Sequence, residues 1–111
     1  MIQAVLRVVV PPGKREEVLE VVRGLMGPTE VSKGCRVCRA FRDVEDGDAV
    51  TYWVQWDTRN QLEEHFRSER FRQLLPYIEM SAEPPEVDVS TFEQIGGIEV
   101  MVAAIAEQAN K

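Results

Sequence analysis

Continuous apolar runs alternate along the chain with apolar residues at helical spacing. Residues 2–10 are largely apolar on both faces and hold a single charge, Arg7, which is typical of a strand buried on two sides. Residues 11–13 read Pro-Pro-Gly and turn the chain, and a helical stripe follows: Val18, Leu19, Val21, Val22, Leu25 and Met26. We expect Gly27 and Pro28 to end this helix.

Two strands and a tight turn are expected after a polar connector over residues 29–33. Residues 35–42 alternate between two faces, one of them more polar, as a half-buried strand does. Asp46 and Gly47 can adopt the positive φ angles of a hairpin turn. Residues 49–56 are rich in Val, Tyr and Trp, which favour sheets. The pattern therefore predicts a β-hairpin.

A cap and helical spacing predict a second helical region after residue 56. Asp57 or Thr58 can accept hydrogen bonds from the free N–H groups at a helix start. Leu62 and His65, together with Phe66, mark the inner side of this helix. A further helical piece starts near residue 69 with an expected kink at Pro76, and its inner residues are Phe71, Leu74, Leu75 and Ile78.

Two elements are expected beyond the break at Pro84 and Pro85. Residues 87–92 alternate as a fourth strand does. After Gly96 and Gly97, apolar residues at helical spacing predict a helix toward residue 111: Ile98, Met101, Val102 and Ile105. A strand over residues 98–102 is the alternative. We expect this tail to dock on its own domain or on a second subunit.

The element order is β-α-β-β-α-β with a helical tail, so the fold class is α+β. This order is that of the ferredoxin-like fold, a four-stranded antiparallel sheet with two helices on one face. We expect this domain over residues 1–93 and a helical extension over 94–111. The strands at 2–10 and 49–56 are apolar on both sides, so the second face also needs cover. In a chain of 111 residues, the tail or a second copy must provide it, and we expect a homodimer.

The charge and composition of the chain exclude some classes of binding partner. The chain carries 13 Lys and Arg against 19 Asp and Glu, a net charge of −6, with Arg scattered among acidic residues. Nucleic acids and anionic membranes are bound by concentrated basic faces, so neither is expected as a partner. No apolar run approaches the roughly 20 residues that span a bilayer, and the N-terminus lacks a leader pattern. We therefore expect a cytoplasmic protein.

Several residues occur in a familiar arrangement. Thr29 is followed by Gly34 and Cys35, and the run from Trp56 to Phe71 contains Thr58, His65 and Ser68. This arrangement resembles the antibiotic biosynthesis monooxygenase family, which includes bacterial quinol monooxygenases, over residues 1–92. The resemblance implies a dimeric α+β barrel in which two sheets pack face to face, with a pocket between a sheet and its helices or inside the barrel.

The resemblance also implies a chemistry. Characterised members of the family oxidise phenols or quinols with molecular oxygen and without a cofactor, other members degrade haem, and many have no assigned reaction. Haem-degrading members typically carry an Asn on the first strand, and this chain has none there. We therefore expect a cofactor-independent monooxygenase for a small aromatic or quinol-type substrate. The alternative is a non-catalytic dimeric barrel that binds a small apolar ligand, as a stress-associated module.

His65 is the candidate catalytic residue. It is the only histidine, and therefore the only side chain that titrates near neutral pH without a perturbing environment. A phenol or quinol must lose a proton before it reduces oxygen, and a base with such a pKa can accept that proton. A His at the border of the helical stripe can instead have a purely structural role.

Tyr52, Trp56 and Arg7 are the candidate substrate-binding residues. Tyr52 and Trp56 share one face of their strand, where an aromatic pair can line a pocket or simply fill the core. Arg7 is a single charge in an apolar strand. Because a buried Arg is unfavourable without a partner, it forms an ion pair, reaches solvent or binds an anionic ligand.

Cys35 and Cys38 form a C-x-x-C sequence that does not predict a redox or zinc site. Residues three apart on a regular strand point to opposite faces, whereas a thioredoxin-type pair begins a helix. Two Cys and one distant His do not complete a zinc site. We expect two reduced thiols and no metal. The sequence also lacks a glycine-rich phosphate loop and a Gly-x-Ser-x-Gly elbow.

Overall fold

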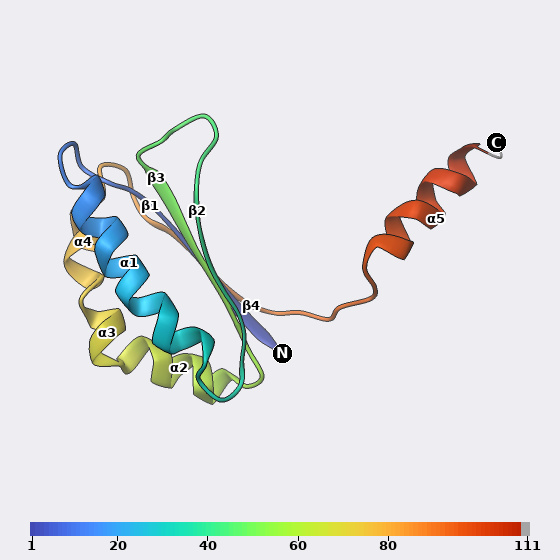
Figure 1. The fold of residues 1–111 in the computed structure, drawn as a ribbon, viewed down its shortest axis with the longest axis horizontal. Helices are drawn as coiled ribbons and strands as arrows, with labels where there is room; N and C mark the ends of the chain where they lie inside the picture. Colours follow the sequence, from blue (N-terminus) through green and yellow to red (C-terminus); the bar gives the residue numbers. More distant parts are fainter. Residues whose placement is uncertain (110–111) are drawn as a thin grey trace.

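The computed structural model describes residues 1–109 and confirms the expected element order (Figure 1). The nine elements are β1 Ile2–Val9, α1 Arg15–Glu30, β2 Cys35–Arg42, β3 Ala49–Trp56, α2 Arg59–Arg67, α3 Glu69–Arg72, α4 Leu75–Glu79, β4 Glu86–Thr91 and α5 Ile98–Ala109. The predicted ferredoxin-like arrangement with a C-terminal helix is therefore present.

The sheet is antiparallel with the strand order β2-β3-β1-β4. β1 and β3 pair along their whole length, from Ile2 opposite Trp56 to Val9 opposite Ala49. Helices α1 to α4 all lie on one side of the sheet (Figure 1). We call this side the helix-facing side of the sheet and the other its open side.

The helix-facing side forms the core. Its buried strand residues are Ile2, Ala4, Leu6, Val8, Val50, Tyr52, Val54 and Trp56. On the open side, Val5, Arg7, Thr51 and Trp53 are only half-buried. The expected cover of this second side does not come from the tail, because Figure 1 shows α5 apart from the rest of the molecule.

The prediction that Gly27 and Pro28 end the first helix is wrong, because α1 continues to Glu30 with Pro28 inside it. Pro28 has no N–H group, so the carbonyl of Gly24, four residues earlier, lacks its helical donor. The Arg70 guanidinium donates a hydrogen bond to this carbonyl at 3.4 Å. Thr29 adds a bond from its hydroxyl to the carbonyl of Leu25 at 2.6 Å. These side-chain contacts help to accommodate the proline in the helix.

A β-bulge shifts the start of β2. Cys35 pairs with Trp56, and Val37 pairs with the adjacent residue Gln55. Arg36 is therefore an extra residue in β2, without a partner of its own. Cys35 and Cys38 consequently pair with Trp56 and Val54, which lie on the same face of β3. The expectation that the two cysteines point to opposite faces is therefore wrong, and both lie on the helix-facing side.

The second helical region is divided into three short helices. Thr58 caps α2 in a capping box, in which its hydroxyl accepts from the N–H of Gln61 at 3.2 Å and the Gln61 side chain accepts from the N–H of Thr58 at 3.1 Å. Pro76 lies in the first turn of α4 and so begins a helix instead of kinking one. Leu75, expected in the core, is 41% exposed.

Removal of the α2 cap has an expected cost. Thr58→Ala should lower the free energy of unfolding by about 1 kcal/mol, because the N–H of Gln61 loses its acceptor, the Thr58 hydroxyl. Denaturant unfolding measures this change. Thr58→Ser keeps the hydroxyl and should remain close to wild type, and an equal loss in both variants would contradict a role for the cap.

The C-terminal extension contains the predicted helix. The strand alternative over residues 98–102 is wrong, because α5 spans Ile98–Ala109. Its apolar residues do not dock on their own domain: Ile98, Met101, Val102 and Ile105 are 55–73% exposed. Residues 110–111 of the predicted extension lie outside the described residues. No helix in the described part of the chain has the length and apolar character needed to cross a membrane.

Candidate functional site

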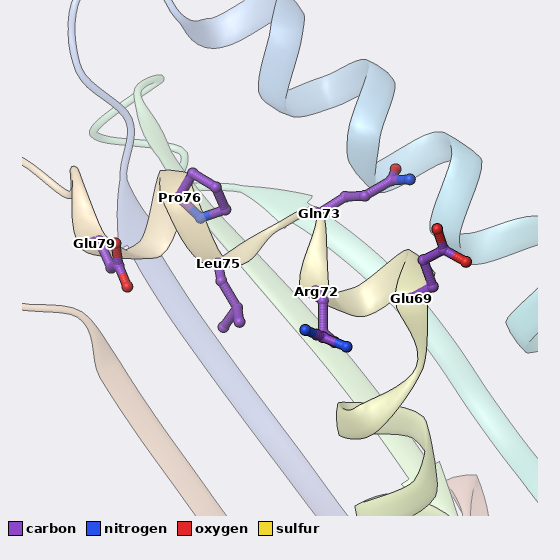
Figure 2. A pocket seen from close by; sticks show the side chains of 6 residues that line it. All are labelled: Glu69, Arg72, Gln73, Leu75, Pro76 and Glu79. Atoms are coloured by element: carbon purple, nitrogen blue, oxygen red, sulfur yellow. The ribbon is translucent and has the colours of Figure 1, made fainter.

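A wide hollow of about 530 Å³ lies on the outer surface of α3 and α4, but it is a poor candidate for a binding site (Figure 2). Glu69, Arg72, Gln73 and Glu79 line most of it, and all four side chains are exposed to solvent. Leu75 and Pro76 complete its wall. Ligand sites in proteins are more often apolar and enclosed, with few polar groups.

An apolar cavity of about 270 Å³ between the sheet and helices α2 to α4 fits that description better. It is lined by Ala4, Leu6, Tyr52, Val54, Phe66, Phe71, Leu75, Ile78 and Val87. The strands supply its floor, and the helices supply its aromatic wall. Of these lining residues, Tyr52 alone carries a polar group. Tyr52 contributes the apolar part of its ring to the wall, because its hydroxyl is turned toward His65 and Cys38. The cavity can therefore hold a small apolar or aromatic molecule.

Tyr52 connects this cavity to a buried chain of hydrogen bonds. Its Oη lies 3.1 Å from Nε2 of His65 and 3.4 Å from Sγ of Cys38. Tyr52 comes from β3, His65 from α2 and Cys38 from β2, so the packing of both helix and strands fixes the contact. All three side chains are buried. A proton can move between these groups without passing through solvent.

Aromatic rings surround His65. The ring centroids of Trp56 and Phe71 each lie 5.3 Å from that of His65, and those of Tyr52 and Phe66 lie at 6.0 Å. This burial disfavours the charged imidazolium and lowers the pKa of His65 to about 4. His65 is therefore neutral at pH 7, and its Nε2 can accept a hydrogen bond from the Tyr52 hydroxyl in one of its two tautomers.

Burial also disfavours the charged forms of the other two groups. It raises the pKa of the Tyr52 hydroxyl well above its ordinary value, and the neighbouring Cys38 adds to this effect. Burial likewise raises the pKa of Cys38, although the hydrogen bond to Tyr52 opposes the shift. Cys38, Tyr52 and His65 are therefore all uncharged at neutral pH.

The structure brings three of the four candidate residues together. Tyr52, Trp56 and His65 form one cluster, but only Tyr52 lines the cavity, and the other two lie beside it. Trp56 is 4% exposed, and its Nε1 is buried without a hydrogen-bond partner among the described residues. Such an unpaired donor is uncommon in folded proteins.

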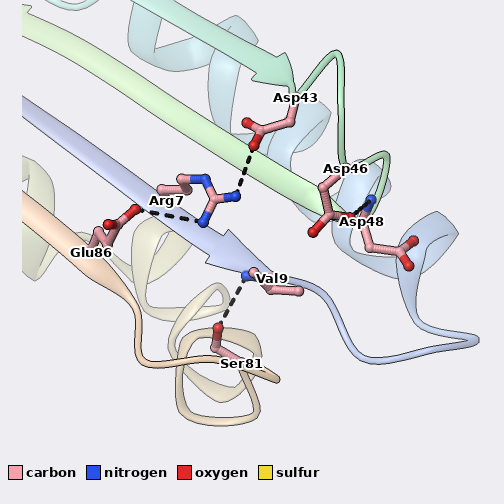
Figure 3. A network of polar contacts seen from close by, with 7 residues as sticks. All are labelled: Arg7, Val9, Asp43, Asp46, Asp48, Ser81 and Glu86. Carbon is pink, nitrogen blue, oxygen red and sulfur yellow. Dashed lines mark hydrogen bonds and ion pairs between the residues drawn. The ribbon is translucent and has the colours of Figure 1, made fainter.

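Arg7 lies elsewhere. It points to the open side of the sheet, where its guanidinium contacts Asp43 at 2.8 Å and Glu86 at 3.5 Å (Figure 3). The ion pair considered from the sequence is confirmed, and the hydrogen bond to Asp43 raises the pKa of Arg7 further. Because adjacent residues of β1 alternate in direction, Arg7 cannot reach the cavity floored by Leu6.

Three residues of the site were not singled out as site residues from the sequence. Phe66 and Phe71 were expected as ordinary core residues, and Cys38 was expected on the face opposite to Cys35. The aromatic spacing along α2 and α3 carried a signal for the first two. Cys38 had no such signal, since the bulge at Arg36 leaves no mark in the hydrophobic pattern.

The two thiols do not have the features of a reactive pair. Burial raises the pKa of Cys35 to about 11, and the nearby Cys38 adds to the shift. Reactive cysteines have lowered pKa values, because the thiolate is the nucleophile and metal ligand. Within residues 1–109, no group of three or more His, Cys, Asp or Glu side chains could hold a metal ion.

Comparison with known structures shows the same fold in several proteins. An antibiotic biosynthesis monooxygenase has 22% identical residues and a TM-score of 0.74, over 85% of this chain and 100% of its own. Rv0793 from Mycobacterium tuberculosis has 18% identity and a TM-score of 0.74, over 86% of this chain and 98% of its own. A conserved protein from Methanosarcina mazei Go1 has 22% identity and a TM-score of 0.73, over 83% of this chain and 92% of its own.

The sequence itself identifies the family. None of the curated proteins matches the chain. The sequence profile of the family described as antibiotic biosynthesis monooxygenase matches residues 1–76, which include β1 to β3, α2 and the whole Tyr52–His65 cluster. This stretch is more than half of the chain, and the fold agrees with it, so the chain belongs to the antibiotic biosynthesis monooxygenase family.

Proposed function

We propose that this protein is a cofactor-independent monooxygenase that oxidises a small aromatic or quinol-type substrate with molecular oxygen. The observation that carries the proposal is the position of Tyr52, which lines the cavity and whose hydroxyl lies 3.1 Å from Nε2 of His65. Membership of a family described as a monooxygenase family supports the same class of reaction.

The cavity suits the proposed substrate in size and chemistry. Its volume of about 270 Å³ is close to the lower end of the roughly 300–1,000 Å³ common for ligand sites, which favours a molecule of one or two rings. Phe66 and Phe71 can pack against an aromatic ring. In the proposed complex the substrate hydroxyl approaches Oη of Tyr52, which must turn or be reached past the Tyr52 ring because it hydrogen-bonds to His65 and Cys38 behind the cavity wall.

In the proposed reaction, Tyr52 and His65 move the first proton. The substrate hydroxyl gives its proton to Oη of Tyr52, while the Tyr52 proton passes to Nε2 of His65. The resulting phenolate gives an electron to oxygen, and the two radicals join at a ring carbon. His65 returns its proton through Tyr52 to the peroxide, the ring carbon loses its C–H proton, and the O–O bond breaks as water leaves. For a simple phenol, one phenol and one dioxygen give one benzoquinone and one water, so the substrate supplies all the electrons.

The low pKa of His65 limits this proton transfer. Between a phenol with a pKa of about 10 and an imidazole with a pKa of about 4, complete transfer is unfavourable by about 8 kcal/mol. This lies below the barrier of roughly 16 kcal/mol that corresponds to ten turnovers per second. Electron transfer to oxygen can therefore draw the proton transfer forward.

We propose that the enzyme acts as a homodimer in the cytoplasm. The half-buried aromatic and aliphatic residues on the open side of the sheet, such as Val5 and Trp53, favour packing against another copy.

A second candidate function is the binding of a small apolar ligand without chemistry. The observation in its favour is that His65, a weak base at pKa about 4, does not itself line the cavity. Binding requires only the apolar wall, whereas oxidation requires the Tyr52–His65 hydrogen bond. Loss of the Tyr52–His65 hydrogen bond should therefore stop oxidation but leave the binding of an apolar ligand intact.

Oxygen uptake with a panel of phenols and naphthoquinols tests the proposal. We expect wild-type turnover with at least one substrate, and a fall in kcat of about 100-fold or more in both Tyr52→Phe and His65→Ala, because general acid–base groups typically contribute that much. Tyr77→Phe is the matched control, since its hydroxyl bonds to Glu17 on the surface at 3.2 Å.

Unchanged rates in both site variants would remove this pair from the mechanism. Saturable binding of the same molecules to the wild type, without oxygen uptake for any of them, would support the ligand-binding function instead.

A further inference from the structure

The helical layer leaves one strand of the sheet uncovered. On β4, Val87 and Val89 pair with Leu6 and Ala4, which are buried beneath the helices, so all four side chains point to the helix-facing side. Yet Val87 is 61% exposed and Val89 is 49% exposed. Helices α1 to α4 therefore leave the helix-facing side of β4 largely uncovered.

This uncovered strip is continuous with the mouth of the apolar cavity. Val87 belongs to the cavity lining, together with Leu75 and Ile78 of α4. Leu75 is 41% exposed, and Met80 at the end of α4 is 45% exposed. We call the surface formed by Leu75, Ile78, Val87 and Val89 the β4 groove. It is apolar and lies between a strand and a helix, the kind of surface onto which an amphipathic helix docks.

The chain also has a helix without a partner. In α5, Ile98, Met101, Val102 and Ile105 form one stripe at the spacing i, i+3, i+4 and i+7. All four side chains are more than half exposed. A helix of 12 residues is marginally stable in water on its own and gains most of its stability from packing.

The helix and the groove match in length, and one cation without an ion pair among the described residues lies beside the groove. α5 is about 18 Å long, and the six residues of β4 span about 20 Å. The charges of α5 are Glu99 and Glu107, one near each end. Two cations flank the groove: Arg59 shares a hollow with Val89 but is paired with Glu63 at 3.0 Å, and Arg72 shares a hollow with Leu75. Arg72 has no ion pair within residues 1–109.

We propose that α5 docks in the β4 groove of a second copy of this chain, and that the partner's α5 docks in return. Figure 1 shows α5 on the side of the sheet opposite to helices α1 to α4, so it faces away from its own groove. Reciprocal exchange of a terminal element is a common route to a symmetric dimer. It covers both unpartnered surfaces in each chain at once.

The exchange completes the cavity with residues of the partner. The groove includes Leu75, Ile78 and Val87, which are also cavity residues, so a docked helix closes the mouth of the cavity. The partner's α5 would close the cavity mouth whatever molecule the cavity binds. The docking therefore does not depend on the proposed oxidation. The experiment that tests the docking therefore measures dimer formation and not the rate of oxidation.

Cross-linking of the full chain tests the docking. Val89→Cys with Ile105→Cys places one thiol in the groove and one on the α5 stripe. Under mild oxidation we expect a disulfide-linked product of dimer mass. Val89→Cys with Ala103→Cys is the matched control, because Ala103 lies about 140° away from Ile98 on the helix. It contains the same native cysteines and should lose most of the linked product.

The mass of the cross-linked product shows whether α5 docks on its own chain or on a second copy. A link between positions 89 and 105 at monomer mass would show that α5 folds back on its own chain, and absence of this link would show that the groove has another occupant; either result overturns the proposal. Ile105→Glu gives a second measurement that leaves the body intact. We expect it to raise the Kd of the dimer about tenfold or more in sedimentation experiments, and an unchanged Kd would also overturn the proposal.

Discussion

Acidification from pH 7 to pH 4 is expected to reduce the free energy of unfolding by about 3 kcal/mol through His65 alone. His65 is 7% exposed, and burial lowers its folded pKa from 6.5 to about 4. Between these two pH values the unfolded chain binds a proton at His65 while the folded chain does not. Stability from this residue is therefore fully present above pH 6.5 and is lost progressively as the pH falls toward 4.

The His65→Gln variant isolates this contribution from that of the carboxylates. Gln does not titrate, so the variant should lose about 3 kcal/mol less than the wild type over the same pH range. Denaturant unfolding at several pH values provides both curves. Parallel curves for the two proteins would mean that His65 has the same pKa in the folded and unfolded chains, contrary to its burial among aromatic rings.

Phe71→Ala is expected to lower the free energy of unfolding by about 3–5 kcal/mol, the largest effect of a single truncation considered for this protein. Phe71 is 6% exposed and packs against Tyr52, His65 and Phe66, with ring centroids 5.0–6.3 Å away. Its loss removes transfer free energy and leaves a void beside the existing cavity. Thermal or denaturant unfolding measures the change.

The enlarged cavity makes a second measurement possible. Apolar cavities of this kind stay dry and bind small aromatic molecules. Added benzene or indole should therefore raise the Tm of Phe71→Ala more than that of the wild type. Val44→Ala, at a fully exposed turn position, serves as the control and should change stability by less than about 0.5 kcal/mol. A similar small change in Phe71→Ala would show that the aromatic cluster is loosely packed.

The hydrophobic pattern was sufficient for the fold because it records which side of each element is buried. Apolar runs rich in Val identified β1 and β3, and helical stripes identified α1 and α5. The same pattern placed Tyr52 and Trp56 on one face and His65 on the inner side of α2, so their contact could be anticipated. The family resemblance added the expectation of a pocket, and the family is confirmed.

The remaining features depend on contacts between residues that are distant in the sequence. Pro28 usually marks a helix end, but here Arg70 of α3 donates to the carbonyl that the proline leaves free. The bulge at Arg36 placed Cys35 and Cys38 on the same face of the sheet, and Leu75 became a cavity-mouth residue because α4 starts there, with Pro76 in its first turn. The helix and strand propensities of neighbouring residues do not predict such contacts between distant parts of the chain.

The buried position of Cys38 also affects how the protein withstands oxidants. With 1% exposure and a pKa raised by burial, this thiol is present in its least nucleophilic form while the chain is folded. Peroxide or an alkylating reagent reaches it only during an opening of the helical layer over β2. The fold itself therefore slows oxidation of this sulfur, which lies next to a cavity proposed to handle oxygen.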